Sequence, residues 1–314
     1  MKQKYSYLIA SLAMAMMTQS SCISDDFDPE LLRLSVDGLG TKAGTRAKTD
    51  ATELQYQQFV ANERIHVDVY EYNSTTPVTT PYTQGTYKTT NASGALSGSL
   101  YYHPTKTVDI EAYYPYTVTY NTASFTVQTT QNDSAHFKAS DLMYAERLTN
   151  KAKGTIWPLT FNHALSQIVV TLTAGDGLLP SDITSNVTSV DIKNVQTEGT
   201  ITNSLSAATP SYTVAATGAT GDINIFSSTV TSESQTAATS TGIIVPQTVN
   251  SGTVLFSITY NGNTYTHTLT ANQTFAAGYT YTYAFTLNIA GIQLSSTSIN
   301  NWTAGVGDSP TINL

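Results

Sequence analysis

The chain has 314 residues, a net charge of −8 and a pI near 5.0, and only 11% of its residues are charged. This length suits two domains of ordinary size plus a leader. The acidic balance, without a basic stripe, argues against a nucleic acid partner, because binding one requires neutralising its phosphates. The 20 tyrosines, with many Thr and Val residues, favour strands, and no long segment has helical apolar spacing. We therefore predict an all-β fold.

Residues 1–21 are predicted to be a signal peptide that delivers a lipoprotein. An apolar run over residues 7–17 is too short to span a bilayer comfortably, and the only cysteine, Cys22, follows it. Residues 19–21 resemble a bacterial lipobox, although Gln19 departs from the usual aliphatic residue. Residues 24–26 resemble the acidic tag that sends Bacteroidales lipoproteins to the cell surface. We expect acylated Cys22 to hold a precursor in outer-membrane lipid; the alternative is an ordinary signal peptide with an incidental cysteine.

The next segment has the pattern of a half-buried strand. Leu32, Leu34 and Val36 alternate with polar residues, so these three side chains are predicted to face a core. Gly38 and Gly40 end the pattern.

A candidate proteolytic site follows this strand. Residues 41–49 hold three basic side chains among small residues and have no apolar periodicity, so we expect them to be accessible to a protease. Cleavage is predicted after Arg46, leaving Ala47 as the new N-terminus, with Lys42 and Lys48 as alternatives. The strand before the cut then belongs to a propeptide. We hypothesise that a strand from a neighbouring subunit of a surface filament replaces it.

The remainder of the chain is predicted to be a succession of short strands. Residues 75–98 are rich in Thr, Pro, Gly and Ser and indicate a hairpin or long loop, and the basic, glycine-containing residues 151–155 indicate a domain boundary. Asn261-Gly262 suits a type I′ hairpin turn. So many short strands with turn signals favour two β-sandwiches. The expected strands cover residues 64–72, 108–116, 125–130, 157–173, 187–195, 223–226, 242–246, 253–260, 264–270 and 279–289.

Several stretches, in this order, resemble the fimbrillins, the pilins of Bacteroidales surface fimbriae. The order of these stretches carries the resemblance, which runs from the lipobox to the C-terminus. They are TRA (45–47), HPTKTVDIEAYYPY (103–116), DLMYA (141–145), LTFNHALSQIVVTL (159–172), IIVPQ (243–247), AAGYTYTYAFTL (276–287) and INNW (299–302).

The resemblance implies two transthyretin-like β-sandwich domains in tandem after a lipoprotein signal peptide. It also implies cleavage after Arg46 by a trypsin-like or Arg-specific protease, and polymerisation with other fimbrial subunits by donor-strand exchange. On this basis the chain divides into a signal peptide (1–21), a propeptide (22–46), an N-terminal domain (47–154), a C-terminal domain (155–290) and a donor tail (291–314).

The tail is rich in Ser, Thr and Asn with scattered apolar residues, as expected of a donor strand. Its predicted anchors are Ile292, Leu294, Ile299 and Trp302. The alternative is that the tail completes its own second domain.

Motifs of catalysis are not found, so we predict no catalytic residue, metal or cofactor. There is no G-x-S-x-G elbow and no phosphate-binding glycine loop. His66 and Asp68 could pair as metal ligands on one strand face, but the other histidines are scattered, and an exposed strand histidine is the commoner explanation; His163 is expected to be structural. Asp133-Ser134-Ala135 resembles a short O-glycosylation sequon of Bacteroidales, which makes Ser134 a candidate modification site.

Two other functions remain open. A tip or accessory adhesin would bind a glycan or a host protein, for which Tyr82, Tyr87, Tyr101 and Tyr102 could stack on a sugar. A surface lipoprotein that keeps its first strand would not polymerise.

Overall fold

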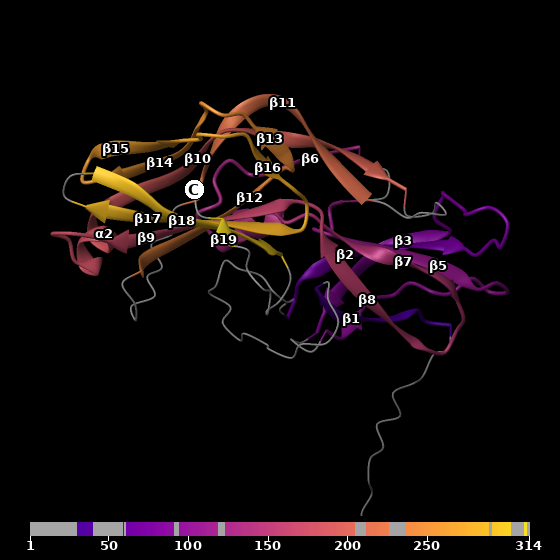
Figure 1. Ribbon diagram of the computed structural model, residues 1–314. Helices are drawn as coiled ribbons and strands as arrows, with labels where there is room; N and C mark the ends of the chain where they lie inside the picture. Colours follow the sequence, from indigo (N-terminus) through magenta and orange to yellow (C-terminus); the bar gives the residue numbers. More distant parts are fainter. Residues whose placement is uncertain are drawn as a thin grey trace, which may run out of the picture.

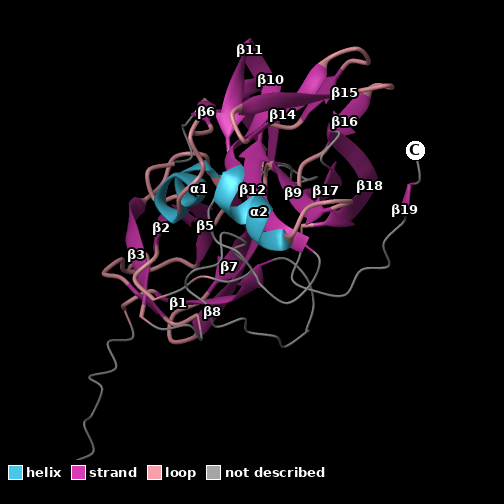
Figure 2. Ribbon diagram, turned by 90° about the vertical axis from the view of Figure 1, so that its left-hand side faces the viewer, coloured by secondary structure: helices cyan, strands magenta, loops and turns pink. Residues whose placement is uncertain are grey.

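The computed structural model describes residues 30–39, 59, 61–90, 94–118, 123–204, 212–225, 236–288, 291–302 and 311–312. These residues form an elongated molecule that is almost entirely β (Figure 1), which confirms the predicted fold class. Both helices in the described ranges, α1 (Ser134–Ser140) and α2 (Pro180–Asn186), have seven residues (Figure 2). Neither is long and apolar enough to cross a membrane.

The N-terminal half is built on one seven-stranded sheet, called here the first sheet. It curls over a core that contains Val67, Ile110 and Phe161. Its two ends approach each other, because Ser35 of the first strand bridges to Ala95, next to the last. In spatial order the strands are β1 (Arg33–Leu39), β8 (Ile156–His163), β7 (Met143–Lys151), β5 (Val108–Tyr114), β2 (Arg64–Glu71), β3 (Thr83–Thr89) and β4 (Leu96–Ser97).

The C-terminal half is a sandwich of two sheets, and its aromatic core joins them. Phe256 contacts Phe285 and Tyr283 of the facing sheet, with ring centroids 5.6 and 4.7 Å apart. The second sheet contains β11 (Tyr212–Asn224), β10 (Val187–Asn203), β14 (Val254–Tyr260) and β15 (Asn263–Thr268), with β6 (Ser124–Thr126) also on β10. The third contains β12 (Thr236–Ile244), β9 (Ser166–Ala174), β17 (Tyr279–Asn288), β18 (Gly291–Asn301) and β19 (Thr311–Ile312). A small ribbon pairs β13 (Gln247–Val249) with β16 (Gln273–Phe275).

A segment of the N-terminal half crosses into the C-terminal core. Between β5 and β7 the chain adds β6 to the second sheet and buries Phe125, Val127 and Phe137 among its side chains. The fully buried side chain of Gln131 both donates to the backbone oxygen of Ile243, at 2.8 Å, and accepts from its N–H, at 2.7 Å. The two halves are therefore joined by more than one passage of the chain.

The predicted boundary between the two domains falls inside the first sheet. The expected boundary at residues 154–155 falls in the hairpin between β7 and β8, which are neighbours in the first sheet. The run expected as one strand over residues 157–173 is two strands in different sheets, broken at Ala164 and Leu165. We propose residues 164–165 as the boundary.

Other local expectations are met in part. The Asn261-Gly262 turn has φ values of 46° and 78°, as a type I′ hairpin requires, and it joins β14 to β15. The region 75–98 contains the paired strands β3 and β4. The long strand β11 was expected only at its end, because residues 212–222 are mostly small and have little apolar alternation.

Candidate functional site

The first strand, β1, fills a slot in the first sheet and is bonded on both edges. It pairs in parallel with β8, from Arg33 opposite Ile156 to Leu39 opposite Phe161. On its other edge, Leu32 N–H donates to Leu100 O at 2.8 Å and Val36 N–H donates to Gly94 O at 2.7 Å. A strand bonded on both sides cannot leave without exposing two rows of backbone groups.

The slot also buries the apolar face of β1 together with Leu32, the residue just before the strand. Leu32 is 1% exposed, Leu34 2% and Val36 9%, and all three belong to the core of the first sheet. The predicted alternation is therefore present. Burial of three such side chains contributes roughly 5–9 kcal/mol.

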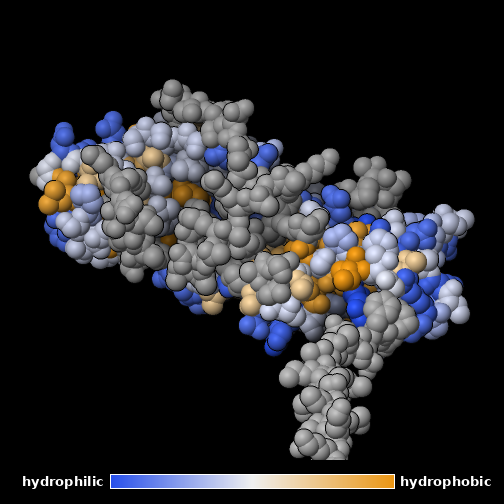
Figure 3. Space-filling view, turned by 90° about the horizontal axis from the view of Figure 1, so that it is seen from below, coloured by the Kyte–Doolittle hydropathy of each residue, from blue (hydrophilic) through white to orange (hydrophobic). Residues whose placement is uncertain are grey.

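β1 is the main partner of the first half of β8. Among the pairs formed by described residues, residues 156–160 of β8 pair only with β1, whereas β7 pairs with β8 at residues 161–163. Pro158, opposite Ser35, has no N–H to donate, so this half of β8 is poorly suited to a central position. Seen from below, apolar side chains reach the surface on this side (Figure 3); Ile156 is 57% exposed. Loss of β1 would leave the first half of β8 without a strand partner.

Two tyrosines proposed above for sugar binding instead line the slot. The Tyr87 hydroxyl donates to Leu32 O at 2.7 Å, and burial raises the pKa of Tyr87 above its ordinary value. Tyr102, only 2% exposed, donates its N–H to Glu30 O at 2.9 Å. Tyr82 and Tyr101 are about half exposed, at 45% and 50%. Half of the predicted tyrosine set is thus unavailable to a glycan.

Gly94 permits the close approach of the backbone to β1. Its φ is +83°, and a Cβ added there would lie 2.1 Å from Val36 O. Gly94→Ala should therefore loosen β1 and lower the free energy of unfolding by about 1–3 kcal/mol. Hydrogen exchange over residues 33–39 would measure the loosening.

Gly154→Ala is the matched control for this prediction. Gly154 has a similar φ of +86°, but an added Cβ would meet nothing within 4 Å. It shares the backbone strain and lacks the contact with β1. Equal exchange of residues 33–39 in the two variants would contradict a role for Gly94 in closing the slot.

The predicted donor residues lie in this chain's own third sheet. Ile292, Leu294 and Ile299 are on β18, which pairs antiparallel with β17, and they are partly buried against the C-terminal core. Trp302, just after β18, is 6% exposed and stacks on His163. The described part of the tail thus completes its own domain, which is the alternative given above.

The other predicted sites are placed as follows. Cys22, Arg46 and Ala47 lie outside the described residues. Ser134 is half-buried at the start of α1, where Asp133 caps the helix by accepting the N–H of His136 at 2.9 Å.

The two histidines singled out in the sequence are buried and paired with carboxylates. His66 Nε2 lies 2.9 Å from Asp68 Oδ1, so the expectation of an exposed strand histidine is wrong. His163 Nδ1 lies 2.7 Å from Asp141 Oδ1, as expected of a structural residue. Within the described ranges no group of three or more His, Cys, Asp or Glu residues could hold a metal ion.

A buried ionic cluster on the face of the first sheet opposite its apolar core was missed by sequence reasoning. Arg147, on β7, donates to Glu111 Oε1 at 2.8 Å and to Asp109 Oδ2 at 3.1 Å. Tyr70 and Tyr113 donate their hydroxyls to Glu111 Oε2, at 3.2 and 2.5 Å. Burial raises the pKa of Glu111. The signal was present in VDIEAYY, where acidic residues alternate with apolar ones inside a strand.

Comparisons with known proteins agree on one family. Residues 45–302 match the family model described as "Fimbrillin-like". A protein of Bacteroides uniformis named as a proposed fimbrium subunit, Fim1C, is 29% identical over 232 residues, which is 70% of each chain.

Two crystal structures share the fold, and both are described as proposed cell adhesion proteins. The one from Bacteroides ovatus has a TM-score of 0.61 at 17% identity and covers 88% of this chain and 99% of its own. The one from Bacteroides uniformis has a TM-score of 0.59 at 20% identity and covers 87% of this chain and 98% of its own. With most of its length matched by the family model, this chain belongs to the fimbrillin-like family.

Proposed function

We propose that this protein is a structural subunit of a cell-surface fimbria. It is exported as a lipoprotein precursor that is acylated at Cys22. The precursor is cleaved after Arg46 by a trypsin-like or Arg-specific protease, and the processed chain polymerises by donor-strand exchange. The observation that supports this most directly is β1 in its slot, bonded on both edges and anchored by Leu32, Leu34 and Val36. The family match begins at residue 45, so the segment that fills the slot precedes the matched residues.

The difference between the tail's own position and the slot supports donor-strand exchange. β18 lies near the edge of the third sheet, followed only by the two-residue β19, and its apolar residues are partly buried. The slot, in contrast, buries three apolar side chains and bonds both edges of its strand. A tail that moves to the slot of the next subunit would lose its pairing with β17, but it would gain bonding on both edges and fuller burial of its partly buried apolar side chains.

The resulting contact would extend without closing. The donor tail and the acceptor slot are different surfaces, so each subunit uses both, which generates an open filament. This accounts for a precursor that keeps its slot occupied. A filled slot delays assembly until the strand is removed at the cell surface.

Electron microscopy of the purified chain after limited trypsin digestion tests this function. The processed chain should form filaments, and Arg46→Gln should remain unassembled unless Lys42 or Lys48 is used. Removing residues 291–314 should abolish polymers of processed chain. A processed chain that stays monomeric at high concentration would overturn the proposal, and glycan binding by that monomer would favour the adhesin alternative.

A further inference from the structure

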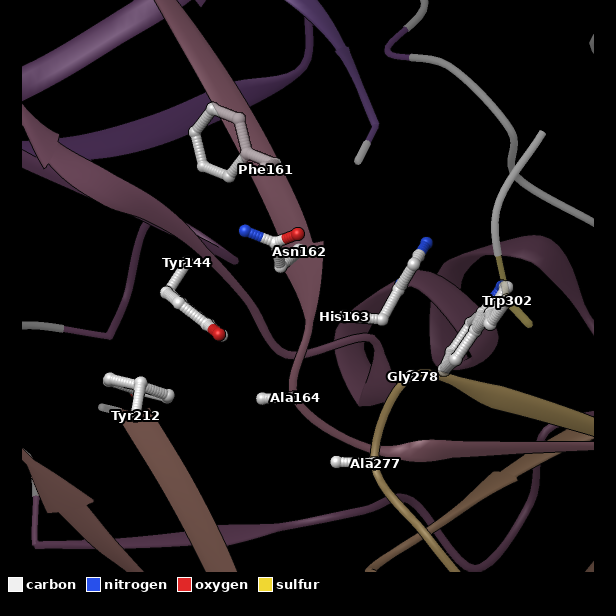
Figure 4. Close-up of a pocket in the computed structure, with 9 residues that line it drawn as sticks. All are labelled: Tyr144, Phe161, Asn162, His163, Ala164, Tyr212, Ala277, Gly278 and Trp302. Atoms are coloured by element: carbon white, nitrogen blue, oxygen red, sulfur yellow. The ribbon is translucent and has the colours of Figure 1, made fainter. Parts of the chain in front are cut away.

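β8, the strand that pairs with β1, and β18 meet at a pair of stacked rings. His163 is the last residue of β8, and Trp302 directly follows β18. Their rings are 3.7 Å apart and nearly parallel, at 7° (Figure 4). Both side chains are buried, at 7% and 6% exposure, although β8 and β18 belong to different sheets.

Each ring is held by its own surroundings. The His163 ring is oriented by Asp141, at 2.7 Å, and the backbone of Trp302 is positioned by its N–H, which donates to Gly278 O at 2.6 Å. Gly278 in turn donates to Leu165 O at 2.8 Å, at the junction of the two halves. A cavity of about 230 Å³ borders the stack, so the ring pair is not enclosed by packing on every side.

β1 supports the strand that carries His163. The β1 pairing runs along β8 as far as Phe161, two residues before His163, and Phe161 is also where the pairing with β7 begins. Without β1, β8 keeps pairs with β7 only at residues 161–163 among the described pairs. Loss of β1 thus removes the strand partner of β8 as far as Phe161, and leaves the end of β8 held by the pair of His163 with Met143 and by the contact of His163 with Asp141.

We propose that the His163–Trp302 stack couples occupancy of the slot to retention of the C-terminal strand. With β1 in place, His163 is fixed and holds Trp302, so β18 stays on its own sheet. When β1 leaves, β8 loosens, the stack weakens and β18 is released as the donor. This inference rests on the proposed function, and it makes His163 and Trp302 positioning residues for the exchange.

Coupling of this kind must act in both directions, because two sites that share a free energy of interaction affect each other equally. Disruption of the stack should therefore loosen β1 in the uncleaved chain. Trp302→Ala is expected to raise hydrogen exchange of residues 33–39 at least five-fold, measured by mass spectrometry on the full chain. Trp302→Phe, which keeps a ring for stacking, should restore most of the protection.

The matched control is Tyr279→Ala. Tyr279 lies opposite Asn301 at the same end of β18, is 40% exposed and is not part of the stack. The Tyr279→Ala substitution should leave the hydrogen-exchange rate of residues 33–39 within two-fold of the wild-type value. Equal exchange of β1 in Trp302→Ala and Tyr279→Ala would overturn the coupling.

The reverse direction can be read from Trp302 itself. The chain has two tryptophans, so Trp157→Phe leaves Trp302 as the only fluorescent indole. In that background Leu34→Ala, which weakens β1, should increase acrylamide quenching of Trp302 at least two-fold. Val67→Ala is the control, because Val67 is similarly buried but lies on β2, which does not pair with β8. This substitution should leave the acrylamide quenching of Trp302 unchanged.

The outcomes separate this inference from the proposed function. Filaments from processed chain, with Trp302 equally protected whether or not β1 is weakened, would refute the coupling and leave the pilin assignment standing. Exposure of Trp302 on weakening β1, with no filaments under any condition, would support the coupling and refute the pilin assignment.

Discussion

Leu34→Asp is expected to expel β1 from its slot in the uncleaved chain and to allow polymerisation without proteolysis. Leu34 is 2% exposed in the core of the first sheet. The substitution removes about 1.5–3 kcal/mol of apolar burial. It also places a carboxylate in an apolar site, where an unpaired charge costs several kcal/mol more. Together these losses are comparable to the roughly 5–9 kcal/mol estimated for the burial of the whole apolar face.

Hydrogen exchange over residues 33–39 and electron microscopy of uncleaved material would measure this effect. Ser35→Asp is the matched control, because Ser35 is the next residue of the same strand, is only half-buried and faces away from the core. It adds the same charge without removing apolar burial. If Leu34→Asp stays protected and monomeric like Ser35→Asp, β1 does not control access to the slot.

Arg147→Met is expected to lower the free energy of unfolding by about 3–5 kcal/mol. The Arg147 side chain is 2% exposed and pairs with Asp109 and Glu111, whose side chains are 5% and 0% exposed. Its guanidinium carbon also lies 4.3 Å from the centre of the Tyr70 ring. Removing the cation leaves two buried carboxylates without their main partner. Urea denaturation of the two proteins would measure the difference.

The loss in Arg147→Met should depend on pH. Burial already raises the pKa of Glu111, and Arg147 is among the groups that lower it, so the variant should raise this pKa further. The folded variant then binds a proton at pH values where the unfolded chain, with an ordinary glutamate pKa near 4.3, has released it. Its stability should therefore fall as pH rises above that value, and the loss relative to wild type should be smaller at pH 5 than at pH 8.

Arg64→Met provides the control for both measurements. Arg64 is exposed, and its guanidinium carbon lies 5.6 Å from the centre of the Tyr116 ring. Its loss should cost about 0.5–1 kcal/mol, with little dependence on pH. A similar, pH-independent loss in both variants would contradict the role given to the buried cluster.

The sequence predicts the strands where side chains alternate and the turns where glycine or asparagine is required. Leu32, Leu34 and Val36 alternate because one face of β1 is buried, and Asn261-Gly262 turns because both residues adopt positive φ. Such local signals need no knowledge of distant partners. They therefore predict the β class and the apolar anchors of the slot.

The pairing of distant segments could not be obtained in the same way. The residues from Trp157 to Thr173 have the composition of a single strand. They nevertheless form two strands, divided at Ala164 and Leu165, because the two parts pair in different sheets. The expected strand from Tyr279 was correct, but nothing local indicates that Trp302 would reach His163. The cluster around Glu111 was missed for the same reason, since its partners come from three strands.

The segment between β5 and β7 has a consequence for a subunit under tension. In a filament, a pull would enter through the occupied slot at one end and leave through the tail at the other. To part the two halves, such a pull would have to draw Phe125, Val127 and Phe137 out of the C-terminal core and also strip β6 from β10. The crossing segment therefore resists separation of the two halves, because its apolar side chains would have to enter water before the halves could part.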